Sequence, residues 1–359
     1  MDVCKLSTID RQNPSSPQWP PEGLEAVGYC PICSSMERIC LYTGLQDKVF
    51  QVAPGQWSLW QCSACGSAYL DPRPTRDTIA HAYESYYTHH TATVKAPYSE
   101  INTLRQWRRR LVNGYTNWRF STRESPASRV GPLLHWVLPI RYRLEHEYRH
   151  LWRRVPSGGR VLDIGCANGA FLQIAKTCGW QVTGVEPDPQ SAANARIMGL
   201  DVHQGGLDVF DDQSELFDII TICHVIEHVH EPMQVLADIH RLLKPGGQLW
   251  LETPNMESIG HRVYRSDWRG LEPPRHLCLF SSASLRRALN RTGFRMIERL
   301  TGPSPLFGIV AASEAIMRHE PYGTPIRLSI GESCFWFAIG IIQFLWPAKR
   351  EFLLVSARK

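Results

Sequence analysis

The stretch VLDIGCANGAFL, residues 161–172, decides the fold of this 359-residue chain. Its apolar beginning, which ends at Asp163, is typical of a buried parallel strand. Gly165 and Gly169 then enclose a tight turn, and apolar side chains recur at helical spacing from Phe171 onward. Residues without a Cβ let backbone approach a ligand, and the free N–H groups at the start of a helix can bind an anion. The stretch therefore predicts a strand, a ligand-binding turn and a helix.

The next apolar segment, residues 181–186, ends in an acid, Glu186. A carboxylate at this position can accept hydrogen bonds from both hydroxyls of a ribose. The spacing from Asp163 to Gly169 lacks the middle glycine that admits a pyrophosphate in dinucleotide-binding turns. The pattern therefore favours an adenosine cofactor without phosphate, and S-adenosylmethionine is such a cofactor.

Two further apolar strands are predicted at 217–223 and 248–252. His224-Val-Ile-Glu-His follows the first of them, and Lys244-Pro-Gly-Gly precedes the second. In this order the segments resemble the class I S-adenosylmethionine-dependent methyltransferases, over residues 155–300. The resemblance implies an α/β fold: a seven-stranded Rossmann-like sheet with helices on both faces. Its sixth strand would be 294–300, with the last, 351–356, antiparallel beside it.

The resemblance also implies the cofactor-binding residues. These are Asp163, Gly165, Cys166, Ala167 and Gly169 in the turn, Glu186 at the ribose, Gly206 and Leu207 at the adenine, and Cys223 and His224 beside the methyl group. Many relatives have glycine where this chain has Ala167, so the fine geometry of the turn stays open.

Methyl transfer to a hydroxyl requires a base, and histidine titrates in the right range. The candidates for the catalytic residues are His276, and His228 together with Glu227; His224 is a further candidate base. Glu227 and His228 are equally consistent with a divalent-cation site, as in relatives that act on ring hydroxyls, or with a purely structural contact.

His276 lies in a proline-stiffened loop, residues 268–280. The loop resembles one that faces the substrate in a branch associated with cell-surface glycans and small-molecule tailoring. Arg269 and Arg275 in this loop are candidates to receive an acidic group of the substrate.

Two C-x-x-C pairs precede this domain: Cys30 with Cys33, and Cys62 with Cys65. Four thiolates in two such knuckles suit one structural zinc ion. The sequence therefore predicts a flexible leader at 1–25 and a zinc ribbon at 26–72, before the methyltransferase domain at 155–359.

Residues 73–154 are predicted to form a helical arm rich in arginine and aromatic residues. Thirteen arginines but only four acids lie between residues 100 and 160, with four tryptophans among them. Three interpretations compete: the arm binds RNA, it lies on an anionic membrane surface, or its tryptophans pack on the catalytic domain while the arginines are solvated.

The composition is that of an ordinary globular protein, with 43% hydrophobic residues and a net charge of +5. The N-terminus has no apolar signal core, and the cysteines do not suggest a disulfide framework, so a cytoplasmic location is expected. Apolar helices are predicted at 306–312 and 335–346, where burial, a homodimer contact and a peripheral membrane contact all remain open.

We therefore expect S-adenosylmethionine-dependent methyl transfer to a sugar, glycan or related small-molecule acceptor, at a hydroxyl. The alternatives are a quinone-type ring O-methyltransferase, an RNA methyltransferase and a non-catalytic cofactor-binding protein. Nucleic acid is disfavoured, because no Asn-Pro-Pro-Tyr-type motif follows the fourth strand; the sequence there is Cys223-His-Val-Ile.

Overall fold

The computed structural model describes residues 18–83, 103–302, 306–321, 324 and 328–359. Residues 1–17 of the predicted leader and 84–102 of the predicted arm lie outside this part. Trp19 is buried, although it belongs to the predicted leader. Just after it, the 3-10 turn η1 (Pro21–Gly23) leads into β1 (Leu24–Glu25), which pairs with β5 (Arg73–Pro74). The packed N-terminal module therefore begins before residue 26.

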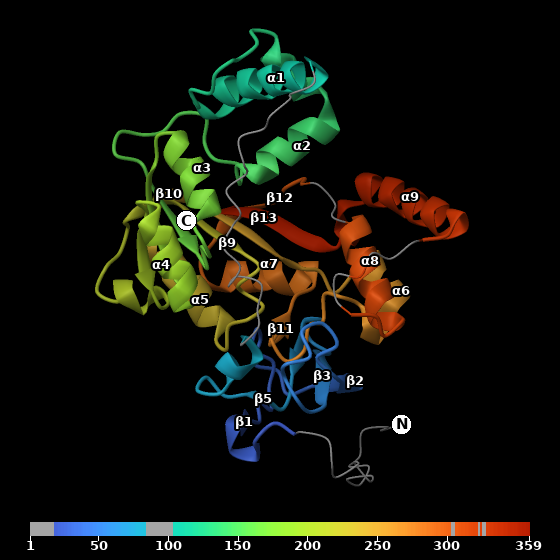
Figure 1. Cartoon of the computed structure of the whole chain (residues 1–359). Coiled ribbons are helices and arrows are strands. Elements are labelled where there is room, and N and C mark those ends of the chain that lie inside the picture. Colours follow the sequence, from blue (N-terminus) through green and yellow to red (C-terminus); the bar gives the residue numbers. More distant parts are fainter. Residues whose placement is uncertain (1–17, 84–102, 303–305, 322–323, 325–327) are drawn as a thin grey trace.

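A seven-stranded sheet forms the centre of the molecule (Figure 1). Its strands are β6 (Arg160–Ile164), β7 (Gln181–Glu186), β8 (Asp201–Gln204), β9 (Phe217–Cys223), β10 (Leu243–Pro254), β12 (Arg295–Arg299) and β13 (Phe352–Arg358). They lie in the order β12-β13-β10-β9-β6-β7-β8. β13 is antiparallel to both of its neighbours, and the other adjacent pairs are parallel. The predicted seven-stranded sheet with an antiparallel last strand is confirmed.

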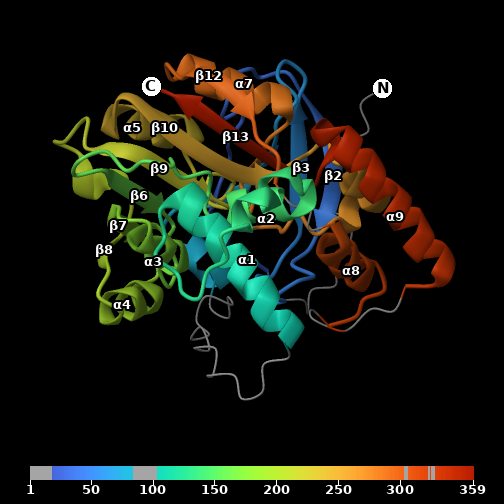
Figure 2. The ribbon, with the colours of Figure 1, turned by 90° about the horizontal axis from the view of Figure 1, so that it is seen from above.

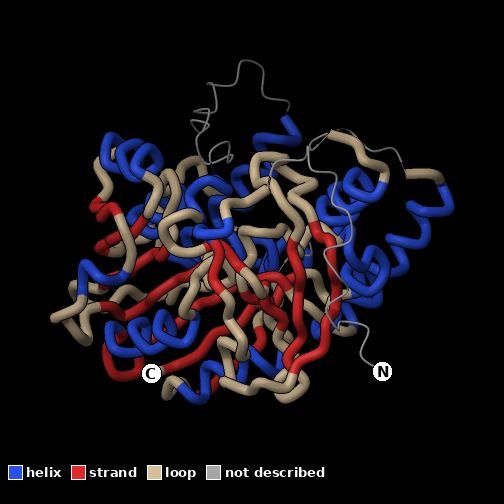
Figure 3. The backbone as a smooth tube through the Cα atoms, turned by 90° about the horizontal axis from the view of Figure 1, so that it is seen from below, coloured by secondary structure: helices blue, strands red, loops and turns tan. Residues whose placement is uncertain are grey.

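Helices cover both faces of this sheet, because alternate residues of its buried strands point to opposite sides. On β6, Val161 packs with Phe171 of one helix, whereas Leu162 packs with Leu236 of another. Figure 3 shows the strands running through the middle with helices outside them. The helices that contact its strands are α3 (Ala170–Thr177), α4 (Pro189–Ile197), α5 (Pro232–Leu242) and α7 (Ser282–Arg291), with the 3-10 turn η5 (Leu207–Phe210) against α5. The same domain also contains α6 (Ile259–Tyr264) and the 3-10 turns η6 (Arg265–Asp267) and η7 (Pro347–Lys349).

The N-terminal module that contains the four predicted zinc ligands, called the cysteine module below, lies below the central sheet in Figure 1 and is joined to it. Its strands β2 (Arg38–Leu45), β3 (Trp57–Cys62) and β4 (Ala68–Leu70) form an antiparallel sheet, followed by the 3-10 turn η2 (Ile79–Tyr83). A fourth strand, β11 (Cys278–Leu279), comes from the loop that contains His276 and pairs with β4. The module and the catalytic domain therefore share one sheet.

The arm lies on the other side of the central sheet from the cysteine module (Figure 1). It consists of α1 (Thr103–Phe120), the 3-10 turn η4 (Gly131–Trp136) and α2 (Leu138–Glu147). Trp118 and Trp152 pack into the core beside β6 and α3, as the packing interpretation expects. Trp107 and Trp136 differ, because they are 59% and 79% exposed.

Two apolar helices follow β12, α8 (Leu306–Met317) and α9 (Ile330–Leu345). α8 is largely a core helix, whereas α9 buries only Trp336, Ile339 and Gln343. Among the helices of the described ranges, none is both long enough and apolar enough to cross a membrane.

Candidate cofactor and catalytic site

The turn after β6 is built from residues with left-handed backbone. Gly165, Ala167 and Gly169 have φ values of +68°, +46° and +78°. A Cβ on Gly165 would lie 2.4 Å from Val225 Cγ2, and one on Gly169 would lie 2.3 Å from Leu200 Cδ1. The two glycines therefore satisfy both the backbone conformation of the turn and its close packing against Val225 and Leu200. Ala167 adopts a conformation that few residues with a Cβ adopt.

Glu186, at the end of β7, holds this turn from the neighbouring strand. Its Oε2 accepts a hydrogen bond of 2.7 Å from the Ala167 N–H, and its Oε1 accepts one of 2.9 Å from the Asp188 N–H. Burial raises the pKa of Glu186, although these backbone donors oppose the shift. The carboxylate is thus fixed at the carboxyl edge of the sheet, where open α/β sheets bind their ligands.

The other predicted cofactor residues lie around this edge. The Gly205 N–H donates to the Glu186 carbonyl at 3.0 Å, so Gly206 and Leu207 follow beside the end of β7. Cys166, within the turn, is buried, and burial raises the pKa of its thiol. The structure therefore brings the turn, Glu186 and the start of η5 together.

Asp163 has an unexpected partner from the arm, Arg149. The two side chains form an ion pair, and Thr221 Oγ1 donates to Asp163 Oδ1 at 2.8 Å. The other carboxylate oxygen, Oδ2, is buried and has no hydrogen-bond partner among the residues that the structure describes. Burial raises the pKa of Asp163, against the Arg149 charge. Arg149 also stacks on Phe171, with Cζ 4.1 Å from the ring centre.

This pair suits the amino-acid end of S-adenosylmethionine. A buried carboxylate oxygen without a partner can accept from an ammonium, and a guanidinium can bind a carboxylate. Arg149 was not among the predicted site residues, because in the sequence it was one of thirteen arginines between residues 100 and 160.

His224, at the end of β9, lies between two buried carboxylates. Its Nδ1 is 3.3 Å from Glu227 Oε1, and its Nε2 is 3.9 Å from Glu252 Oε1. Burial lowers the pKa of His224, but the hydrogen bond with Glu227 and the charge of Glu252 outweigh it, and the net shift is upward. Although burial opposes it, the contact with His224 lowers the pKa of Glu227 to about 2. The imidazole side chain is still 38% exposed.

Glu252 also binds a histidine of the arm. His146 on α2 donates from Nε2 to Glu252 Oε2 at 2.6 Å. Both side chains line a small cavity, together with Arg299, Gly302, Arg350 and Phe352. The His224 ring lies edge-on to Phe352, which lines this cavity, with centroids 4.5 Å apart, so the cavity adjoins His224. His146 and Glu252 were both missed, because 106 residues separate them in the sequence.

The predicted catalytic residues Glu227, His228 and His276 do come together, with ligand atoms within 4.8 Å of one another. Each is engaged by protein groups, however. Glu227 is buried and accepts from Thr253 Oγ1 at 3.0 Å. The Nδ1 of His276 donates to the Gly270 carbonyl at 2.8 Å, and burial lowers the pKa of this histidine to about 4.

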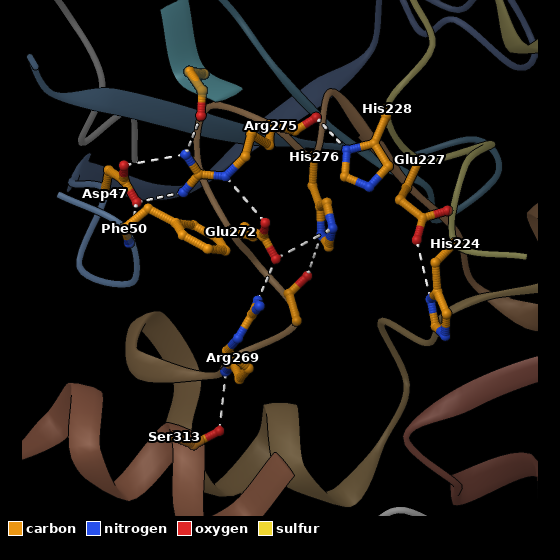
Figure 4. A network of polar contacts seen from close by, with 12 residues as sticks. Asp47, Phe50, His224, Glu227, His228, Arg269, Glu272, Arg275, His276 and Ser313 are labelled. Atoms are coloured by element: carbon orange, nitrogen blue, oxygen red, sulfur yellow. Dashed lines mark hydrogen bonds and ion pairs between the residues drawn. The ribbon is translucent and has the colours of Figure 1, made fainter. Parts of the chain in front are cut away.

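Arg275, in the same loop, connects the cysteine module to the catalytic domain (Figure 4). Its guanidinium is fully buried and binds Asp47, Glu272 and the Ala82 carbonyl. Arg269 pairs with Glu272 and is also buried. The interpretation of these two arginines as receivers of an acidic substrate group is therefore wrong: both belong to an internal ion-pair network.

The four predicted zinc ligands lie within 4.8 Å of one another. Cys30 Sγ is 3.6 Å from Cys65 Sγ, and Cys33 Sγ is 3.5 Å from Cys62 Sγ. The hydrogen bond with Cys65 lowers the pKa of Cys30 to about 4. A tetrahedron with Zn–S bonds of about 2.3 Å has edges of about 3.8 Å, so this group could hold zinc.

Part of the chain matches a known protein family. Residues 138–299 match the family described as "Methyltransferase domain". This part of the chain is therefore similar to methyltransferase domains. The match includes β6, Glu186, His224 and Glu252, and it begins inside the predicted arm.

Several proteins are similar to part of this domain. The ubiquinone biosynthesis O-methyltransferase of Xanthomonas oryzae pv. oryzae is 36% identical over 106 residues, which cover 28% of this chain and 44% of that protein. The protein of the same name from Pseudomonas aeruginosa is 33% identical over 129 residues, covering 34% and 53%. The chain thus spans about half the length of these relatives. A solved S-adenosylmethionine-dependent methyltransferase from Thermotoga maritima, titled a possible histamine N-methyltransferase, is 24% identical with a TM-score of 0.39, covering 64% of this chain and 96% of that one.

Proposed function

We propose that this protein transfers a methyl group from S-adenosylmethionine to a hydroxyl of a small-molecule acceptor. The observation that carries the proposal is the buried Asp163 Oδ2, which has no hydrogen-bond partner in the described part of the chain and lies beside Arg149 and the left-handed turn. When bound, S-adenosylmethionine supplies an electrophilic methyl group on a sulfonium. Asp163 and Arg149 would hold its amino-acid end, and Glu186 would accept the ribose hydroxyls.

In this proposal His224 is the base that removes the acceptor proton. Glu227 fixes the neutral tautomer, because Nδ1–H donates to its carboxylate and leaves Nε2 with the free lone pair. His276 is less suited, since a buried imidazole with a pKa of about 4 is a weak proton acceptor. His228 and His276 would then position the loop against Glu227, with rings 4.7 Å apart.

For the acceptor, we favour a hydroxyl on an aromatic ring. The partial relatives are named as ubiquinone biosynthesis O-methyltransferases, and the cavity beside His224 offers the Phe352 ring as one wall. The sugar or glycan acceptor expected from the sequence gains no comparable support, and it forms a second arm of the test.

We further propose that the four cysteines hold one structural zinc ion. A closed set of four thiolates leaves no position for a substrate, which is the arrangement of structural sites. Ser281 Oγ donates to the Cys65 carbonyl at 3.3 Å, and Arg291 donates to the Ile32 carbonyl at 2.8 Å. A zinc ion would therefore order the surface on which α7 rests.

The test uses purified protein and S-adenosylmethionine with a labelled methyl group. A catechol-type phenol, a soluble nucleotide-sugar pool and RNA are offered separately, each with and without EDTA. We expect label on the phenol at a rate that EDTA leaves unchanged. Label on the sugar pool alone would overturn the ring acceptor, and label on RNA alone would overturn the small-molecule class.

Two further outcomes test the mechanism. If EDTA abolishes turnover and magnesium restores it, a cation bound at Glu227 and His228 replaces His224 as the activator of the hydroxyl. If S-adenosylmethionine does not bind in calorimetry, the proposed function fails as a whole.

A further inference from the structure

α9 exposes apolar side chains around most of its circumference. Phe337 is 64% exposed, and Leu345 and Trp346, at the end of the helix, are 70% and 68% exposed. Phe335, Ile341, Ile342 and Phe344 are each between 41% and 50% exposed. A cluster of this kind on one short helix is more than scattered surface hydrophobicity, and it marks a contact surface.

The arm continues this apolar surface. In η4, Leu133 is 63% exposed and Trp136 is 79% exposed. Tyr142 on α2 lies against Phe344 on α9, with ring centroids 6.3 Å apart, so the two elements meet. Figure 2, seen from above, shows α1, α2 and α9 uncovered on this side of the molecule.

The start of α1 adds positive charge beside the apolar surface. All residues from 103 to 110 are exposed, and four of them are arginines: Arg105, Arg108, Arg109 and Arg110. Leu104 and Trp107 are 69% and 59% exposed and lie one helical turn apart. The helix contains no Asp or Glu along its whole length.

We infer that α9, η4 and the first two turns of α1 form a docking face for the surface of an anionic lipid bilayer. Arginines that flank exposed tryptophan, phenylalanine and leucine side chains are typical of elements that lie in the membrane interface. Anionic head groups would neutralise the α1 arginines, while Trp136 and Trp346 have the amphipathic rings that favour the headgroup level. The elements would rest on the bilayer without crossing it.

The charge distinguishes this partner from a second copy of the chain. A two-fold contact repeats every charge on both sides, and α1 has no acid that could offset the arginines of the other copy. The inference is independent of the proposed methyl transfer, because lipid binding can be measured without cofactor or acceptor.

The experiment is co-sedimentation of the full chain with sonicated vesicles of phosphatidylcholine alone or with one third phosphatidylglycerol. We expect binding to the mixed vesicles that weakens as salt rises, and at least tenfold weaker binding to neutral ones. Reversing three exposed charges (R105E, R108E and R109E) should weaken binding at least tenfold, and F337D with I341D should do the same.

Matched controls are R286E with R287E on α7 and I197D on α4, all exposed positions on other elements. They should bind like the original protein, and circular dichroism should show every variant folded. Equal binding by F337D/I341D, or no binding by the original chain, would overturn the inference. A stable dimer that F337D/I341D dissociates, without vesicle binding, would show that the face joins two copies and would overturn it as well.

Discussion

Replacing Arg149 with methionine should selectively weaken binding of the amino-acid end of the cofactor. Arg149 pairs with Asp163 and stacks on Phe171. Methionine keeps an unbranched apolar side chain beside Phe171 but removes the guanidinium. Because the Arg149 charge opposes the upward pKa shift of Asp163, its loss also makes that carboxyl harder to ionise.

The expected loss of affinity follows from the hydrogen bond that the guanidinium would make to the carboxylate of the cofactor. A hydrogen bond to a charged group contributes about 1.5–3 kcal/mol. Since about 1.4 kcal/mol changes a dissociation constant tenfold, affinity for S-adenosylmethionine should fall about 10- to 150-fold.

Isothermal titration calorimetry with three ligands measures this effect. S-adenosylmethionine and S-adenosylhomocysteine both carry the amino-acid end and should weaken together. Methylthioadenosine lacks that end and should bind Arg149→Met as it binds the original protein. Arg153→Met, a neighbouring arginine that stacks on Trp118 instead, is the matched control. The reasoning is refuted if Arg149→Met binds S-adenosylmethionine within threefold of the original, or if it loses methylthioadenosine to the same extent.

Three other changes test the remaining assignments. Cys62→Ser should lose its bound zinc in atomic emission, whereas Cys40→Ser, outside the four-cysteine group, should retain it. Glu252→Gln removes a charge that raises the pKa of His224. Because the base must be neutral, the rising limb of kcat against pH should lie above about pH 6.5 in the original protein and move to lower pH in the variant. If the limb does not move, His224 is not the base. Asp47→Ala leaves the two buried arginines, Arg269 and Arg275, with Glu272 as their shared carboxylate, so one buried positive charge loses its counterion. The free energy of unfolding in urea should fall by about 3–5 kcal/mol, and a fall below about 1 kcal/mol would mean that the network does not hold the cysteine module in place.

The parts of the site that the sequence predicted are local in the chain. Gly165, Ala167 and Gly169 lie within five residues, and the backbone angles of this turn follow from residue type and spacing. Glu186 closes the next strand, and parallel strands place their carboxyl ends along one edge. Such short-range rules were enough for the turn, whereas the seven-stranded sheet with its antiparallel last strand was implied by the family resemblance.

The parts that were missed depend on contacts between distant segments. His146 and Glu252 are 106 residues apart, and no periodicity connects a helix of the arm to the end of β10. For Arg275 the sequence suggested a role that the structure does not support. Its place in a loop expected to face the substrate suggested a substrate contact, while Asp47, 228 residues away, keeps it buried. Burial of charged groups is set by such pairing, and sequence pattern carries little information about it.

These contacts change where the functional unit begins. From the sequence, the catalytic domain is expected to start at residue 155, but Arg149 and His146 supply the partners of Asp163 and Glu252. The family match begins at residue 138, which includes both. One turn before His146 on the same helix, Tyr142 contacts α9 at the proposed lipid-docking face. α2 and the residues directly after it therefore link that outer face to the candidate cofactor site, and displacing them would remove His146 and Arg149 together.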